Sequence, residues 1–156
     1  MDIDKKFLKL AVRQAKDSLA KGGFPAGAVL VRDGKVIARS GSLGAVTNDP
    51  TAHCEMMCIR KACKKLGTTD LEGCVLYGSM ESCLMCFSAA NWAHLSKIVY
   101  GCKKTDELVD GGCYEGSNDH KSVNDNNKHK VVTEYLNDFE SEILAMIDKW
   151  VNVQKF

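Results

Sequence analysis

The order of helical and strand-like patterns in this 156-residue chain predicts an α/β fold, a three-layer α/β/α sandwich with helices on both faces of a sheet. Three observations support this. The chain opens with an amphipathic helical pattern, continues with two apolar runs joined by a turn, and then alternates strand-like with helical segments. No repeat or Gly/Ser-rich linker divides the sequence, so we expect residues 1–156 to form a single domain.

The composition is typical of a compact globular protein, with 45% hydrophobic and 26% charged residues. The 21 Lys and Arg nearly balance the 20 Asp and Glu, so no global field attracts nucleic acid or a membrane surface. No apolar run is long enough to span a bilayer, and the first residues do not resemble a signal peptide. We therefore expect a cytoplasmic protein without a membrane partner.

The first elements are a helix and a hairpin. Apolar residues recur at helical spacing through residues 4–20, which predicts an amphipathic helix. Short apolar runs at 28–31 and 36–38 predict two strands. Asp33-Gly34 lies between them, and this dipeptide is a strong signal for a two-residue hairpin turn.

A second helix and a third strand follow. Asp49 and Pro50 suit the N-cap and first helical position, so we expect a helix over residues 50–66. Gly67 is the expected stop, because glycine favours the left-handed conformation that ends many helices. The run at 74–78 predicts a buried strand.

The remainder continues the alternation. We expect a helix over 83–94, a strand over 97–101, a further strand within 130–135 and a final helix over 141–152. Residues 103–130 are polar and weakly patterned, which predicts a long loop. A loop of that length in a compact domain is usually functional or mobile.

Two short motifs contain candidate metal ligands. His53 stands near one predicted helix start, and Cys83 and Cys86 form a C-x-x-C motif at another, where Ser82 can act as the N-cap. One imidazole and two thiolates are the protein ligands of a catalytic zinc site, whose fourth position is open to water. Cys54 is adjacent to His53, but neighbours on a helix project about 100° apart, so shared chelation is awkward. Redox pairs also use C-x-x-C, so that motif alone leaves both interpretations open.

Glu55 suggests the reaction. Zinc lowers the pKa of a bound water to about 7, and a nearby carboxylate can accept the proton and return it elsewhere. His53 and Glu55 lie about 200° apart on an ideal helix and do not share a face. They converge on one ion only if the helix points end-on at the metal, as their first-turn position suggests.

H-x-E and C-x-x-C together match the signature of zinc base deaminases. Residues 48–55 (NDPTAHCE), 59–67 (IRKACKKLG) and 81–86 (ESCLMC) resemble the cytidine-deaminase-like superfamily, and within it the small bacterial guanine deaminases. The resemblance covers residues 5–105 and weakens after that.

The resemblance implies a five-stranded mixed sheet and one Zn²⁺ per chain, held by His53, Cys83 and Cys86. It implies that Glu55 carries a proton from water to a ring nitrogen and to the departing amine, which releases ammonia. It also implies a homodimer, in which residues 103–156 can be a mobile or subunit-exchanged segment.

Three positions depart from the family pattern. Ser82 replaces the usual Pro before the first zinc cysteine. Ser42 stands where the family carries an Asn that binds the base, and a hydroxyl offers different donors and acceptors from a carboxamide. Guanine deaminases also place an acid in the loop after the sheet, and the nearest candidate is Glu115 beside Tyr114.

Two further residues are candidate substrate contacts with plain structural alternatives. Trp92 lies six residues after Cys86 and either walls the pocket or packs in the core. Asn48 either contacts the substrate or forms the turn before Asp49-Pro50.

The leading hypothesis is a zinc aminohydrolase that acts on a free purine base, guanine or a close relative. The same chemistry on cytosine, a nucleoside or another amino-heterocycle remains open because of Ser42. A tRNA adenosine deaminase would need a positive channel for phosphates, for which the chain offers only Lys103-Lys104 and Lys128-His129-Lys130. A non-catalytic zinc-stabilised module is the non-enzyme alternative, and it would have no need of Glu55.

Overall fold

The computed structural model describes residues 2–154 and contains the predicted sheet of five strands. The strand order is β2-β1-β3-β4-β5; β1 is antiparallel to β2 and β3, whereas β3, β4 and β5 are parallel. The strands are β1 (Gly27–Arg32), β2 (Lys35–Gly41), β3 (Cys74–Gly78), β4 (Lys97–Tyr100) and β5 (Val132–Tyr135). The sheet is therefore mixed, as expected.

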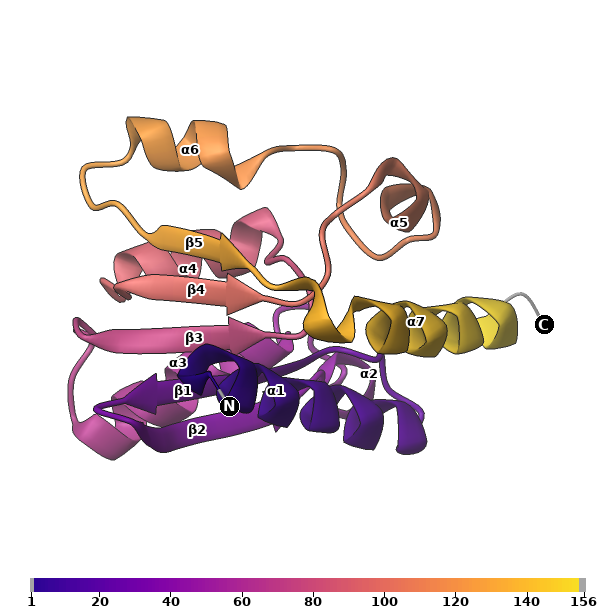
Figure 1. Cartoon of the computed structure of the whole chain (residues 1–156), viewed down its shortest axis with the longest axis horizontal. Coiled ribbons are helices and arrows are strands. Elements are labelled where there is room, and N and C mark those ends of the chain that lie inside the picture. The colour runs from indigo at the N-terminus through magenta and orange to yellow at the C-terminus, as the bar shows by residue number, and fades with distance from the viewer. Residues whose placement is uncertain (1, 155–156) are drawn as a thin grey trace.

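Helices cover both faces of this sheet (Figure 1). On one face α1 (Ile3–Ala20) contacts four strands and also packs against α7 (Glu140–Gln154). On the other face α3 (Cys54–Leu66) packs on β1 and β2 and beside α4 (Leu84–Trp92). The three-layer α/β/α prediction is confirmed. Among residues 2–154, the structure contains no helix that is both long enough and apolar enough to cross a bilayer.

Helix α1 approaches the backbone of the sheet closely at Gly27. The helix buries the apolar stripe that begins at Phe7 and Leu8 and ends at Ala15. A Cβ atom at Gly27 would lie 2.3 Å from the Ala11 carbonyl oxygen and 2.3 Å from the Ala15 nitrogen. Only glycine permits that approach. The first strand therefore starts against α1, and its first residues pair with the C-terminal end of β3.

The hairpin between β1 and β2 forms as the sequence predicts. Asp33 and Gly34 both have positive φ angles, 49° and 71°. Positive φ at both central residues defines the type I′ turn, whose twist matches that of the flanking strands.

The start predicted for the second helix is wrong by four residues. Asp49 does not cap α3; its carboxylate accepts hydrogen bonds from the Thr51 nitrogen and hydroxyl, at 2.8 and 2.7 Å. This local turn holds residues 48–51 outside the helix, which begins at Cys54. A short helix, α2 (Gly44–Thr47), precedes the turn and was not predicted. Gly67, with φ of 65°, ends α3 as expected.

The segment 103–130 is not a structureless loop. It contains α5 (Asp106–Asp110) and α6 (His120–Asn126), which Thr105 and Asp119 cap through their side chains. Both helices are too short to show a clear hydrophobic period, so the sequence pattern could not reveal them. The last strand and helix follow as predicted, with a 3₁₀ turn (Asn137–Phe139) between them.

Candidate active site

His53, Cys83 and Cys86 come together at one edge of the sheet and could hold a metal ion. The His53 Nδ1 atom lies 3.6 Å from each sulfur, and the three ligand atoms all lie within 4.8 Å of one another. With usual zinc–nitrogen and zinc–sulfur bond lengths, a tetrahedral site requires a nitrogen–sulfur separation of about 3.6 Å. The donor set and its spacing therefore fit zinc.

Two helix starts converge to make this cluster. His53 is the N-cap residue of α3, and Cys83 is the N-cap residue of α4. Both helices thus point end-on at the cluster, as the spacing of His53 and Glu55 required. The positive ends of the two helix dipoles favour thiolates there.

Ser82 does not cap α4, contrary to expectation. Its side chain is buried, and its Oγ atom has no hydrogen-bond partner among the described residues. The first amide of the helix, Leu84 N–H, instead donates to Glu115 Oε1 at 3.0 Å. Glu115, from the segment after β4, therefore caps the start of α4 in place of Ser82.

The two thiols of the cluster have opposite pKa shifts. Hydrogen bonding with Cys86, assisted by His53, outweighs burial and lowers the pKa of Cys83 to about 5. Hydrogen bonding to Cys83, together with burial, raises the pKa of Cys86 well above its usual range. The hydrogen bond to Cys83 also raises the pKa of His53. A divalent cation would favour the thiolate form of both cysteines, because coordinating thiols are deprotonated.

Glu55 lies beside this cluster in the first turn of α3. The residue is only 6% exposed, and burial raises the pKa of its carboxyl, with a further contribution from the negative charge of Cys83. Gly78, at the end of β3, lies next to it: a Cβ atom there would be in ordinary contact with Glu55 Oε1, at 3.9 Å. A buried carboxylate with a raised pKa beside a metal site is suited to proton transfer.

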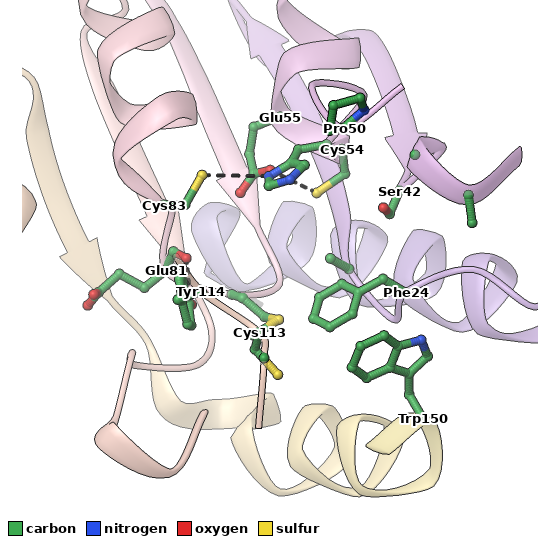
Figure 2. A pocket seen from close by; sticks show the side chains of 16 residues that line it. Phe24, Ser42, Pro50, Cys54, Glu55, Glu81, Cys83, Cys113, Tyr114 and Trp150 are labelled. Atoms are coloured by element: carbon green, nitrogen blue, oxygen red, sulfur yellow. Dashed lines mark hydrogen bonds between the residues drawn. The ribbon is translucent and has the colours of Figure 1, made fainter. Parts of the chain in front are cut away.

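A pocket of about 360 Å³ opens onto Glu55 and the cluster (Figure 2). Figure 2 shows Glu55 and Cys54 along one side and Phe24 and Trp150 along the other. The two aromatic rings meet edge to face, with centroids 4.8 Å apart. Such a volume is at the small end of the range for small-molecule sites, which is roughly 300–1,000 Å³.

The five predicted substrate contacts divide into two groups. Ser42 and Tyr114 line the pocket, and the Tyr114 hydroxyl donates to the Glu81 carbonyl oxygen at 2.7 Å. Glu115, Asn48 and Trp92 are not among the lining residues. Their roles as substrate contacts therefore stay predictions.

The structure gives each of these three residues another role or setting. Glu115 is exposed and bonds to the start of α4. Asn48 is exposed in the left-handed conformation that ends α2, so its turn alternative holds. Trp92 is 85% exposed at the end of α4, so it does not pack in the core of this chain.

A family model described as the cytidine and deoxycytidylate deaminase zinc-binding region matches residues 1–102. The chain belongs to this family of zinc-dependent deaminases. The cluster of His53, Cys83 and Cys86 lies within the matched residues.

Several curated relatives of this deaminase-family chain are similar to it over different lengths. A guanine deaminase of Bacillus subtilis is 38% identical over 143 residues, covering 86% of the chain and 90% of the relative. A tRNA-specific adenosine deaminase of Aquifex aeolicus is 42% identical over 94 residues, covering 60% of the chain and 62% of the relative. The chain thus spans less than two thirds of the second relative.

Solved structures of both guanine and tRNA deaminases resemble this chain. The X-ray structure of the Bacillus subtilis guanine deaminase is 36% identical, with a TM-score of 0.66, over 95% of this chain and 93% of that one. A tRNA:A34 deaminase structure is 32% identical, with a TM-score of 0.71, over 85% and 98%. A guanine deaminase of Nitrosomonas europaea shares the fold, with a TM-score of 0.81 and 20% identity.

Two features of this deaminase-family site were missed in the sequence. Trp150 comes from the final helix, and its partner Phe24 lies far away in the chain, so no local pattern connects them. The Cys54 thiol donates to Glu55 Oε2 at 3.1 Å. The sequence suggested Cys54 only as a metal ligand, although its adjacency to Glu55 was a signal for this contact.

Proposed function

We propose that this chain catalyses the zinc-dependent hydrolytic deamination of a free purine base, guanine or a close relative. The observation that carries the proposal is the small pocket in which an aromatic pair, Phe24 and Trp150, lies across from Glu55. A flat ring between these walls would lie beside both the acid–base group and the candidate metal ligands.

In this proposal His53, Cys83 and Cys86 hold the zinc ion. When bound there, zinc supplies a water molecule of lowered pKa and a positive charge that stabilises the developing negative charge. Glu55 would accept one proton from the water and deliver it to a ring nitrogen. It would then accept the second proton, from the hydroxyl added to the ring carbon, and deliver it to the leaving amine, so that ammonia departs and a carbonyl remains. The buried position of Glu55 keeps bulk water from competing for these protons.

The chemistry of the pocket wall supports an uncharged heterocycle. The lining residues include two acids and one histidine but no Lys or Arg. A phosphate group would lack a cationic partner there. Ser42 and Tyr114 contribute polar atoms to the lining, while Phe24, Met80 and Trp150 contribute apolar surface. A free base suits that combination better than a nucleotide does.

Deamination of adenosine in tRNA is the second candidate, because of the similarity to the Aquifex protein. Two observations weigh against it. The similarity to the guanine deaminase extends over 86% of the chain, and that to the Aquifex tRNA deaminase over 60%. Lys104 and Lys130, which belong to the basic runs after residue 102, donate to carbonyl oxygens of their own segment.

Ammonia release by the zinc-loaded protein tests the proposal. The panel contains guanine, adenine, cytosine, their nucleosides and a tRNA anticodon hairpin, with Glu55→Gln as the blank. We expect turnover of guanine or a close purine relative. Turnover of the hairpin alone would overturn the proposal, and turnover of cytosine alone would assign the chemistry to a different base.

The family resemblance also leads us to propose a homodimer. Light scattering of the zinc-loaded protein tests this, and a monomer mass at micromolar concentration would contradict it.

A further inference from the structure

Residues 112–120 contact the segment that carries both candidate zinc cysteines. The Tyr114 hydroxyl donates to the Glu81 carbonyl oxygen at 2.7 Å, two residues before Cys83. Glu115 Oε1 accepts the Leu84 amide at 3.0 Å, one residue after it. Consecutive residues of one loop thus hold the backbone on both sides of a candidate metal ligand.

A third contact lies further along the same segment. The His120 ring stacks on Phe87 of α4, with centroids 4.9 Å apart and an interplanar angle of 26°. Its Nδ1 atom lies 3.9 Å from Glu81 Oε2. Figure 2 shows the Glu81 side chain directed away from the pocket, toward the outer side of this segment. Helix α4 is therefore held from outside along its first turn.

The Glu115 contact replaces a missing cap. Ser82 and Cys83 make no side-chain cap at α4, and the Ser82 hydroxyl has no partner among the described residues. The carboxylate of Glu115 is therefore a side-chain acceptor for the first amide of this helix. A negative charge at a helix start also interacts favourably with the helix dipole.

We propose that Glu115 is a positioning residue of the zinc site: it fixes the first turn of α4, and through it Cys83 and Cys86, rather than contacting substrate. Tyr114 assists by holding the Glu81 carbonyl. The proposal rests on the zinc site and is independent of which base the enzyme deaminates. Groups that orient metal ligands usually change metal affinity about 10- to 100-fold when they are lost.

Two substitutions at Glu115 separate the possible roles. Glu115→Ala removes the acceptor, and Glu115→Gln keeps an acceptor oxygen without the charge. Glu107→Ala, in exposed α5, is the matched control. Zinc affinity is measured by competition with a chelator, ligand geometry by the visible absorption of the cobalt-substituted protein, and stability by thermal unfolding of the metal-free protein.

For Glu115→Ala we expect zinc affinity about 10-fold weaker and a shifted cobalt spectrum. We expect Glu115→Gln to recover most of the affinity and Glu107→Ala to match the wild type. Wild-type zinc affinity in Glu115→Ala would overturn the proposal. If KM for the base then rises, Glu115 is a substrate contact; if only the metal-free melting temperature falls, its role is general stability.

Tyr114→Phe tests the second contact, with Tyr135→Phe as its control. The Tyr135 hydroxyl donates to Glu140, away from the candidate metal ligands. We expect a smaller loss of zinc affinity than for Glu115→Ala, about threefold, because one neutral hydrogen bond is lost. Equal zinc affinities in the two tyrosine variants would remove Tyr114 from the proposal.

Discussion

The Cys54 thiol donates a hydrogen bond to Glu55 Oε2 at 3.1 Å, although the two residues are neighbours on one helix turn. Burial raises the pKa of Cys54 well above its ordinary value, and the negative charge of Glu55 adds to the shift. The sulfur therefore keeps its proton and remains a donor. The contact fixes one carboxylate oxygen and leaves the other facing Gly78 and the pocket edge.

Replacing Cys54 by Ala should slow the reaction without loss of zinc. The Cys54 hydrogen bond opposes the burial that raises the pKa of Glu55. Its removal raises that pKa further, so the acidic limb of the rate profile moves to higher pH. A thiol is a weak donor, so we expect a loss of about 1 kcal/mol, or about fivefold in kcat.

Cys54→Ser is the matched control because a hydroxyl restores the donor. Its acidic limb should lie near that of the wild type. A pH–rate profile and a zinc analysis of both variants check the prediction. If Cys54→Ala left the acidic limb unmoved, the thiol would have no influence on the acid–base group.

Glu55→Gln should retain zinc and lose activity. The amide keeps the size of the side chain but cannot accept and return a proton, and removal of an acid–base group usually costs about 100- to 10,000-fold. Turnover is measured by ammonia release, and metal content by atomic absorption. An activity within tenfold of the wild type would exclude Glu55 from the proton transfer.

The sequence predicted the candidate metal cluster more accurately than the boundaries of the helices around it. The H-x-E and C-x-x-C motifs predicted that two helix starts converge, because their side chains must meet to bind one metal ion. This prediction held even though the start of α3 was placed four residues early. Asp49 and Pro50 favour a helix start and a turn equally, and in the structure the local hydrogen bonds from Thr51 to the Asp49 carboxylate form the turn.

The pocket walls were harder to predict because they come from distant parts of the chain. Trp150 reaches Phe24 only once α7 has packed against α1. Ser82 has the residue type of an N-cap, yet the loop containing Glu115 supplies the acceptor instead. Long-range contacts of this kind leave no periodic signal in one sequence.

Trp150→Ala should weaken substrate binding more than it slows chemistry. The indole forms one pocket wall with Phe24 and does not lie beside Glu55. Loss of an aromatic contact of about 1 kcal/mol predicts a KM about fivefold higher with kcat little changed. Trp92→Ala is the control, since that side chain is 85% exposed and outside the pocket. Equal KM values for the two variants would contradict the pocket assignment.

Removal of zinc should destabilise the fold. The three candidate ligands belong to two helix starts, so a bound ion ties α3 to α4. With free zinc at about 1,000 times its dissociation constant, binding adds about 4 kcal/mol, or a melting-temperature shift of about 10 °C. Differential scanning calorimetry with and without a chelator measures this shift. Cys86→Ser should show little shift, and a full shift in that variant would exclude Cys86 as a ligand.

Asp4→Asn should destabilise the protein at neutral pH but not in acid. Asp4, on α1, accepts hydrogen bonds from Tyr77 of β3 at 2.6 Å and Lys97 of β4 at 2.9 Å. Burial raises the pKa of Asp4, but the bonds from Lys97 and Tyr77 outweigh it, so the pKa lies below its ordinary value of 3.8.

A lowered carboxyl pKa contributes stability above pH 3.8, and that stability is lost as the pH falls through the folded-state pKa. We therefore expect Asp4→Asn to lose about 1 kcal/mol near pH 7 and nothing in strong acid. Urea unfolding across that range measures the difference. Asp138→Asn, at the exposed pair with Lys5, should resemble the wild type throughout. A difference for Asp4→Asn that persists unchanged into acid would show that the charge of Asp4 does not couple α1 to the sheet.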